Sequence, residues 1–567
     1  MAAEDRYASA TPLMTLGRIG TAVTRSTTSS RSASSPPRAP WLADVVAIAS
    51  LVIVLAFVLT TVVLSPLKDD VAWLLWVARK WLDGRDLYVD LVEVNPPLVI
   101  WLYAIPAGIA HALNVAPKLI ATLFFAVILL GSAWWTASLL HRRAPLFDRR
   151  APVFSAIAIL LLVLPGVEFG QREHLLAASV LPYIALFVRS LEGEKEPLVA
   201  ASVAGAFAAV GCAMKPSYGL ALVLVEAIGV LRGRRTIRLA PLAFIGTTGL
   251  YGVGVLVFEP DFLTRAVPLA LALYGGSDTS VWHILTESRN LLFGQAATLV
   301  LCAYSQSVLG RQSPFLRHLY LALVAFAVAC TVLFVMQGKD WFYHRLPATT
   351  ATVLALILWL SVFVRVQFGQ HGGDAAALPW RRFTAPAALA VAALFAFGVA
   401  NVQRIHPWVE AAAVPSMSTE AKLVKLIKRE KARTYIAFSE WIALGFPVVN
   451  DSGVSWASRF DSMWALKGEI WKTHQDGRAP KEWPIRRWVA RDFVAGCPDI
   501  AVVDTREGTN YIAVLVASDE EFARAWSHYR EIAAFDGLKV FKREELGCAS
   551  EPLPPGRPPQ TAVVPSE

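Results

Sequence analysis

The chain has 567 residues, of which 55% are hydrophobic and 17% are charged, and its mean hydropathy is +0.48. So apolar a composition excludes a soluble enzyme of this length and predicts a polytopic membrane protein. The formal net charge of +9 does not indicate nucleic-acid binding, because the basic residues lie in short clusters between apolar stretches rather than in a basic domain.

The first 40 residues are rich in Ser, Thr, Ala and Arg, with no acidic residue after Asp5. This composition predicts a disordered cytoplasmic tail. The apolar stretch that follows is too long for the core of a cleaved signal peptide, so we expect it to be the first membrane span.

Apolar stretches of about 20 residues are needed to cross the hydrocarbon layer of a bilayer. The sequence predicts about eleven spans, some shorter than ideal, at 42–64, 118–140, 151–168, 174–190, 197–214, 217–232, 239–258, 291–310, 317–336, 346–365 and 383–401. The basic loops alternate along the chain at 141–150, 189–196, 232–238, 311–318 and 365–382. This alternation places the N-terminus in the cytoplasm and the C-terminal part outside. We expect the membrane to be a bacterial inner membrane, with the C-terminal part periplasmic or extracellular.

The apolar segment 98–113 is ambiguous, because it is short for a span and contains Pro106, Gly108 and His111. Counting it as a span would place the basic loop 141–150 outside. We therefore expect a juxtamembrane or re-entrant helix along the outer face.

The composition changes after residue 401. Charged helical patterns at 419–431 and 519–528 alternate with strand-like runs at 434–438, 500–504 and 538–542. The sequence thus predicts a transmembrane domain at 41–401 with a first external loop at 65–117, an external α/β domain at 402–550, and a disordered Pro-rich tail at 551–567.

Two of the five cysteines, Cys497 and Cys548, lie in the predicted external domain. An oxidising location would let them form a disulfide, which the chain-entropy model values at about 4 kcal/mol. The other three lie in predicted spans and are interpreted as small buried hydrophobic residues.

Two adjacent carboxylates, Asp69 and Asp70, follow the first span directly. Ionisable groups placed against a bilayer are costly, so the pair is a candidate catalytic site. A carboxylate can act as a general base toward a hydroxyl or an amine. The alternative is that both residues only stabilise the N-terminus of the helix that follows them.

Other predicted external corners supply side chains that could share one chamber with the pair. Cations suited to a departing phosphate are Arg172, His174, Lys215, Lys339, His344 and Arg345. Candidate substrate contacts are Asn95, Glu173, Trp341 and Tyr343. Some of these have simpler interpretations: residues 172–174 could pair internally at a helix end, and Lys215 could extend its ammonium group from a helix end. The aromatic run 446–466, with Arg459, Asp461 and Trp464, either covers the chamber or packs the core of the external domain.

The segment after Asp69-Asp70 has a recognisable pattern. Gly84 follows Asp70 by fourteen residues, and Leu87-Tyr88-Val89-Asp90 and Asn95-Pro96-Pro97-Leu98 then precede an aromatic-rich helix. This pattern resembles the first external loop of the GT-C superfamily of polyprenyl-phosphate-sugar glycosyltransferases. It is similar in particular to the branch of aminoarabinose transferases and protein O-mannosyltransferases.

The resemblance implies a GT-C-like fold and an inverting transfer of a sugar from a polyprenyl-phosphate carrier to a glycan, lipid or protein acceptor. It implies that Asp69 is the catalytic base and that Asp70 stands at the second acidic position. The sequence departs from the pattern at Asn95, where relatives often have Lys, so a phosphate contact expected there must come from elsewhere.

The sequence contains no HExxH, paired CxxC or Walker-type motif, so it predicts no cofactor, no ATP site and no structural zinc. The lipid-linked sugar is a substrate. Nothing in the sequence demands a divalent metal, although a carboxylate pair can hold one.

Two rival functions stay open. A transporter or flippase for lipid-linked or anionic solutes would show mid-span charges and internal repeats, yet Glu226 is the one clear mid-span acid and no repeat is evident. A non-catalytic relative would keep the scaffold and bind lipid carriers without turnover.

Overall fold

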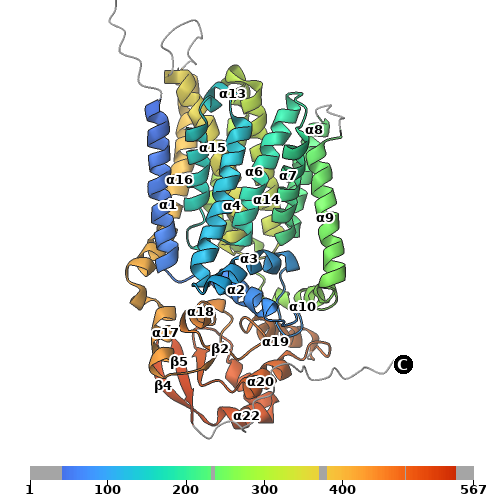
Figure 1. Ribbon diagram of the computed structural model, residues 1–567, viewed down its shortest axis with the longest axis vertical. Helices are drawn as coiled ribbons and strands as arrows, with labels where there is room; N and C mark the ends of the chain where they lie inside the picture. The colour runs from blue at the N-terminus through green and yellow to red at the C-terminus, as the bar shows by residue number, and fades with distance from the viewer. Residues whose placement is uncertain (1–40, 232–236, 369–379, 479, 545–567) are drawn as a thin grey trace, which may run out of the picture. The chain divides into compact units, whose positions relative to one another are not determined.

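The computed structural model describes residues 41–231, 237–368, 380–478 and 480–544. Seven of its helices are long and apolar enough to cross a membrane. They are α1 (Trp41–Leu64), α4 (Pro117–Leu140), α6 (Arg172–Leu191), α9 (Leu239–Phe258), α14 (Pro314–Met336), α15 (Leu346–Phe368) and α16 (Trp380–Ala413). They run roughly parallel in Figure 1, which confirms the prediction of a polytopic α-helical membrane protein.

The other four predicted spans are also helices, but they are short or broken. Pro165 and the left-handed Gly166 follow soon after α5, and Pro216 separates α7 from α8. The short helices are α5 (Arg150–Val163), α7 (Leu198–Met214) and α8 (Gly219–Leu231). The broken span comprises α12 (Arg289–Cys302) and α13 (Ser305–Gln312), which meet at 72° and count as one span if the pair crosses together.

The segment between the first two long helices folds as α2 (Asp69–Leu82), a loop, and α3 (Pro97–Leu113). Pro97 begins α3 at a position where a missing backbone N–H costs nothing, and Asn114 ends it in the left-handed conformation. In Figure 1 the two helices lie across the end of the bundle rather than along it. This placement matches the juxtamembrane helix expected for 98–113.

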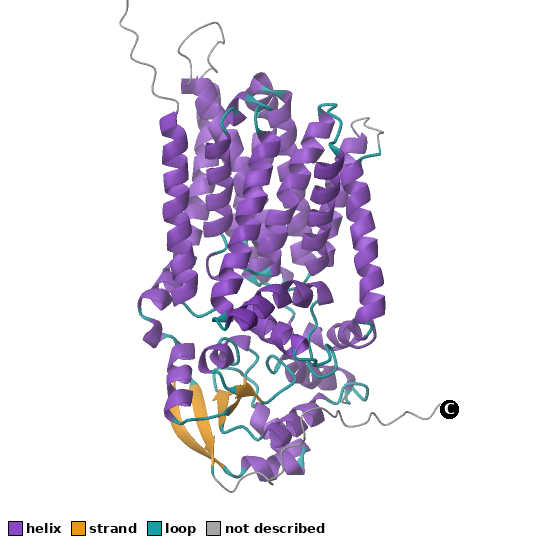
Figure 2. Cartoon of the chain, in the orientation of Figure 1, coloured by secondary structure: helices purple, strands orange, loops and turns teal. Residues whose placement is uncertain are grey.

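The C-terminal domain contains a five-stranded mixed sheet with strand order β2-β1-β3-β5-β4. The central strands β1 and β3 are parallel, and β5 pairs antiparallel with β3 and β4. Figure 2 shows the strands confined to this domain. The bounds are β1 (Thr434–Phe438), β2 (Ser455–Trp456), β3 (Ile500–Asp504), β4 (Tyr529–Phe535) and β5 (Leu538–Arg543).

The helices of the domain connect and cover these strands. They are α17 (Thr419–Arg429), α18 (Val448–Ser452), α19 (Trp464–Asp476), α20 (Ile485–Gly496), α21 (Tyr511–Ser518) and α22 (Glu520–Trp526). The predicted α/β class is confirmed. The helix α16 continues past residue 401, the predicted end of the transmembrane domain, to Ala413. Cys497 is disulfide-bonded, and Cys548, its predicted partner, lies outside the described residues.

The C-terminal domain packs directly on α2 and on the loop after it. The ring of Phe446 lies 4.9 Å from that of Trp73 and 5.4 Å from that of Trp76, measured between centroids. The backbone N–H of Val92 donates to the carbonyl of Arg459 at 2.8 Å. Asn450 donates from its side chain to the carbonyl of Ala72 at 3.1 Å. These contacts fix the position of the aspartate pair relative to the domain.

Candidate active site

The aspartate pair begins α2, where it faces the positive end of the helix dipole. The Asp69 carboxylate accepts the backbone N–H of Asp70 at 2.9 Å and lies 3.2 Å from the ammonium of Lys68. Lys68 also lies 3.6 Å from Glu168. Burial raises the pKa of Asp69, and the neighbouring Lys68 opposes that rise. Asp69 is therefore held in an ion-pair group centred on Lys68.

The second aspartate points to different partners. Gln171 donates from its side-chain nitrogen to Oδ2 of Asp70 at 3.0 Å. Burial lowers the pKa of Lys215, while the carboxylates of Glu173 and Asp70 oppose that shift. Burial raises the pKa of Tyr274, and Asp70 adds to the rise. Asp70 thus lies within electrostatic reach of the cations and phenols deeper in the site.

Three buried residues and the half-buried Lys215 form what we call the Glu173 cluster, which consists of Arg172, Glu173, Lys215 and His344. Glu173 is fully buried, and its Oε1 lies 3.5 Å from both Lys215 Nζ and His344 Nε2. Arg172 Nε is 4.0 Å from the other oxygen. Lys215 Nζ and His344 Nε2 are 3.1 Å apart. Three corners of the bundle, at the ends of α5, α7 and α14, therefore meet here.

The hydrogen bonding of this cluster is incomplete. Among the residues that the structure describes, both oxygens of Glu173, Nε of Arg172 and Nδ1 of His344 are buried without a hydrogen-bond partner. Buried polar atoms are almost always hydrogen-bonded, and each exception calls for an explanation. Of these atoms, Nε of Arg172 can donate to a bound anionic group, whereas the Glu173 oxygens only accept and need a donor from the bound molecule.

Two other side chains that were predicted to contact the phosphate, Lys339 and Arg345, already donate hydrogen bonds within the protein. Lys339 donates to the carbonyl of Tyr274 at 2.8 Å and to Asp278 at 2.7 Å. Arg345 donates to the backbone carbonyls of Glu287, at 2.5 Å, and Asp340, at 2.7 Å. Both side chains tie neighbouring segments of the chain together.

His174 is also fully engaged, because its Nδ1 accepts the Gly170 N–H at 3.1 Å and its Nε2 bonds the Leu161 carbonyl at 2.8 Å. The structure places it in the packing between α5 and α6. The Tyr343 ring lies 5.8 Å from the Arg172 guanidinium and stacks on Trp341 at 5.9 Å. These two aromatic residues therefore border the Glu173 cluster.

Glu93 is a site residue that the sequence analysis missed, and it explains the position of Asn95. Its buried carboxylate accepts the Trp73 indole N–H, the Val94 N–H at 2.8 Å and the Asn95 side chain at 2.6 Å. Burial raises the pKa of Glu93, and these hydrogen bonds together with Arg172 oppose the rise. Asn95 thus holds a carboxylate of its own loop.

Asp461 reaches the same region from the C-terminal domain. Burial raises its pKa, and the charges of Glu93 and Asp70 raise it further. Its Oδ1 is buried without a partner among the described residues. The aromatic run 446–466 thus contributes to the site as well as to the core of the domain. No sequence motif includes Gln171, Glu93 or Asp461. The sequence pointed to them only through their position in or beside segments that had been identified as candidate site segments.

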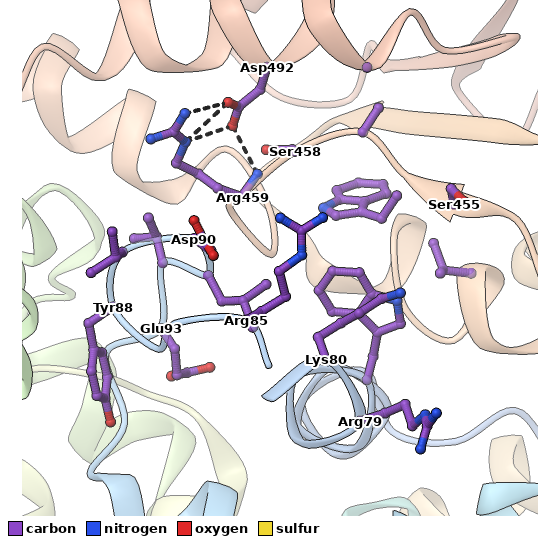
Figure 3. Close-up of a pocket in the computed structure, with 18 of the residues that line it drawn as sticks. Arg79, Lys80, Arg85, Tyr88, Asp90, Glu93, Ser455, Ser458, Arg459 and Asp492 are labelled. Atoms are coloured by element: carbon purple, nitrogen blue, oxygen red, sulfur yellow. Dashed lines mark hydrogen bonds and ion pairs between the residues drawn. The ribbon is translucent and has the colours of Figure 1, made fainter. Parts of the chain in front are cut away.

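A cavity of about 1400 Å³ lies between α2 with its loop and the C-terminal domain. Figure 3 shows Arg85 reaching from the loop toward the segment that carries Arg459, which is paired with Asp492. Glu93 lines this cavity, but neither Asp69 nor Asp70 does. The cavity is therefore separate from the aspartate pair and meets the site through Glu93.

No group of three or more His, Cys, Asp or Glu side chains among the described residues is placed to hold a metal ion.

The sequence matches no protein-family model and no curated protein sequence. The structure is similar to that of ArnT from Cupriavidus metallidurans bound to undecaprenyl phosphate, with 13% identity, a TM-score of 0.49 and coverage of 90% of this chain and 100% of the other. The apo form of that protein gives 12% identity and a TM-score of 0.48, with coverage of 90% and 99%.

The archaeal oligosaccharyltransferase AglB from Archaeoglobus fulgidus, in complex with an inhibitory peptide and a dolichol-phosphate, gives 13% identity and a TM-score of 0.42, with coverage of 90% and 75%. The ArnT structure holds undecaprenyl phosphate, and the AglB structure, that of an oligosaccharyltransferase, holds a dolichol-phosphate. At these identities and TM-scores the likeness concerns the course of the chain and says nothing of individual side chains.

Proposed function

We propose that this protein is a membrane glycosyltransferase that moves a sugar from a polyprenyl-phosphate carrier to an acceptor. The reaction takes place at the end of the bundle that packs on the C-terminal domain, on the external face of a bacterial inner membrane. The observation that carries the proposal is the position of Asp70, bonded by Gln171, next to a cluster in which Nε of Arg172 and both oxygens of Glu173 have no hydrogen-bond partner among the described residues.

In this proposal the Glu173 cluster binds the phosphate of the donor. The buried Arg172 and the half-buried Lys215 lie 3.5 to 4.0 Å from the Glu173 carboxylate, distances longer than those of well-formed hydrogen bonds. Phosphate oxygens are strong acceptors for such groups. The lipid tail then lies among the apolar helices, which run from this site into the bilayer.

The aspartate pair supplies the base. The acceptor hydroxyl attacks the anomeric carbon, its proton passes to the carboxylate, and the bond from that carbon to the phosphate oxygen breaks, which releases polyprenyl phosphate. A single displacement inverts the anomeric configuration. The resemblance implies Asp69 as the base, whereas the contacts favour Asp70, because Asp69 is paired with Lys68 and Asp70 faces the cations.

The test is sugar transfer and donor binding by the full chain in proteoliposomes, with a panel of polyprenyl-phosphate sugars. We expect Asp70→Asn to lower kcat by about 10²- to 10⁴-fold, the usual contribution of a general base, with donor binding nearly unchanged. Asp69→Asn should have a smaller effect. Asp83→Asn, at the other end of α2, is the matched control. Full turnover by Asp70→Asn would contradict the assignment, and a transporter or binding protein would be insensitive to all three changes.

A further inference from the structure

The cavity between α2 and the C-terminal domain is lined by basic and aromatic side chains that the proposed donor site does not use. We infer that it binds the acceptor, and that this acceptor is a saccharide carrying several anionic groups. The inference rests on the proposed function for the role of acceptor, and on the lining of the cavity for the chemical class.

The lining of the cavity is predominantly basic. Eight of its residues are Lys or Arg and five are Asp or Glu. One of the acids, Asp492, is already engaged by Arg459 at 2.7 Å. Four of the cations form no ion pair with any carboxylate among the described residues, namely Lys80, Arg85, Arg487 and Arg491. Unpaired cations in a concave site attract anions and orient them.

These cations come from facing walls. Lys80 and Arg85 belong to α2 and its loop, and Figure 3 shows both on that side of the cavity. Arg487 and Arg491 are one helical turn apart on α20, whose opposite face buries Val489 and Phe493. A ligand that used both walls would need anionic groups at separated positions, as a charged glycan chain has.

Aromatic rings line the same space. They are Trp76, Trp456, Trp483, Trp488 and Tyr88. Indole faces offer broad apolar surface together with an N–H donor, a combination suited to the alternating apolar and hydroxyl surfaces of a sugar ring. The volume of about 1400 Å³ exceeds that of a typical site for one small molecule, so it has room for several sugar units.

A peptide fits this lining less well. The strand that borders the cavity, β2, has only two residues, which is too short for an extended peptide to pair with it. Glu93 connects the cavity with the proposed catalytic site, because it lines the cavity and lies within electrostatic reach of Arg172. Leu67, which also lines it, is two residues from Asp69.

The first experiment measures binding to the full-length protein in detergent, with a hexamer of galacturonic acid as the anionic probe and maltohexaose as the neutral one. We expect the anionic probe to bind at least tenfold more tightly and to weaken as salt is added. The double variant Arg487→Glu/Arg491→Glu should lose this preference. The control variant Arg524→Glu/Arg530→Glu reverses two exposed charges of the same domain outside the cavity and should retain it.

A second arm replaces Trp483 by Ala, which should weaken the anionic probe severalfold without changing its salt dependence. A third arm offers a phosphorylated glycolipid in neutral vesicles. Binding of the soluble hexamer supports a free glycan, and binding of the vesicles alone supports a glycolipid head group. Either result supports the anionic saccharide class if the Arg487→Glu/Arg491→Glu variant abolishes it.

Measurable and equally tight binding of the two hexamers, no binding of either the anionic hexamer or the glycolipid vesicles, unchanged binding by the charge-reversed variant, or tighter binding of a neutral peptide would overturn the inference. The proposed function is tested separately by Asp70→Asn. If that variant loses transfer while the cavity binds no anionic saccharide, the function stands and the acceptor class is wrong. If the cavity binds the hexamer while Asp70→Asn retains full transfer, the catalytic assignment is wrong.

Discussion

Two charged clusters lie in the bundle, the Glu173 cluster mostly buried and the cluster around Arg238 half-buried, and they differ in how completely they are hydrogen-bonded. In the cluster around Arg238, Glu196 accepts two bonds from the guanidinium and the backbone N–H groups of Leu239 and Ala240 at 2.9 and 3.2 Å. Glu226 accepts from Arg238 and from the Tyr183 hydroxyl. In the Glu173 cluster, by contrast, neither oxygen of the central carboxylate accepts a well-formed hydrogen bond from the described residues.

The difference separates a structural cluster from a binding site. A buried ion pair repays its desolvation only when geometry and hydrogen bonds are good, as they are around Arg238. The Glu173 cluster lacks such hydrogen bonds. Buried groups whose hydrogen bonding is incomplete are typical of ligand-binding sites. The Glu226 carboxylate, which a transporter would need at mid-span, instead pairs with Arg238 where α9 begins.

The largest effect on stability should come from removing the central cation of the cluster around Arg238. Arg238→Ala would leave the half-buried Glu196 and Glu226 without their common cation, which should lower the free energy of unfolding by about 3 kcal/mol, the lower end of the cost of breaking a buried pair. Thermal unfolding in detergent measures it. A change in stability below about 1 kcal/mol would show that this cluster is not structural.

The same substitution in both clusters sharpens the comparison. Glu196→Gln removes a charge that accepts four hydrogen bonds and should cost about 2–3 kcal/mol. Glu173→Gln removes a carboxylate that accepts no well-formed hydrogen bond from the described residues and should change stability by less than about 1 kcal/mol, while it alters donor binding. Equal losses of stability in the two variants would remove the distinction between the clusters.

The pH dependence of stability should reveal Glu168, beside the aspartate pair. Burial raises the pKa of Glu168 to about 7 from an ordinary value of 4.5, against the opposing charge of Lys68. The folded protein therefore holds this proton more tightly than the unfolded chain. Stability that is present below pH 4.5 should be lost as the pH rises toward 7, by about 2 kcal/mol between pH 5 and pH 7.

The Glu168→Gln variant provides the control for that measurement, because it cannot titrate in this range. Thermal unfolding of the variant should lose this part of the pH dependence. If the wild type and the variant follow the same curve, Glu168 is not the titrating group.

The smallest effect should come from a cation that is already bonded. Arg345→Lys would lose one of two hydrogen bonds to backbone carbonyls, at a cost of about 1 kcal/mol. Donor affinity should stay the same, because the Arg345 guanidinium is engaged by the protein. A tenfold loss of donor affinity would instead place Arg345 in the phosphate site.

The sequence was sufficient for the long helices and for much of the C-terminal sheet. Apolar length determines a span, and the runs at 434–438 and 500–504 became strands with those bounds. The strands β2 and β4 were missed. The strand β2 has only two residues, too few to show an alternating pattern. The strand β4 (Tyr529–Phe535) begins soon after the helix α22 ends, so no turn signal in the sequence separated the strand from the predicted helix.

The site was predicted less completely, for a physical reason. A cationic side chain at a corner can face a ligand or a carbonyl of its own fold, and the sequence of the corner is the same in both cases. Arg345 and Lys339 proved to be bonded within the protein, whereas Arg172 and Lys215 proved to surround one carboxylate. Asp461 reaches the site from a distant part of the chain, which only tertiary packing can bring there.

The most direct test of the account is the affinity for polyprenyl phosphate, measured on the full-length protein in detergent. If the Glu173 cluster is the donor site, Arg172→Met and Lys215→Met should each weaken binding of polyprenyl phosphate by at least tenfold, since each removes a charged hydrogen-bond donor to the phosphate. The matched variant Arg345→Lys should bind as the wild type does. Unchanged affinity in both cluster variants would contradict the account.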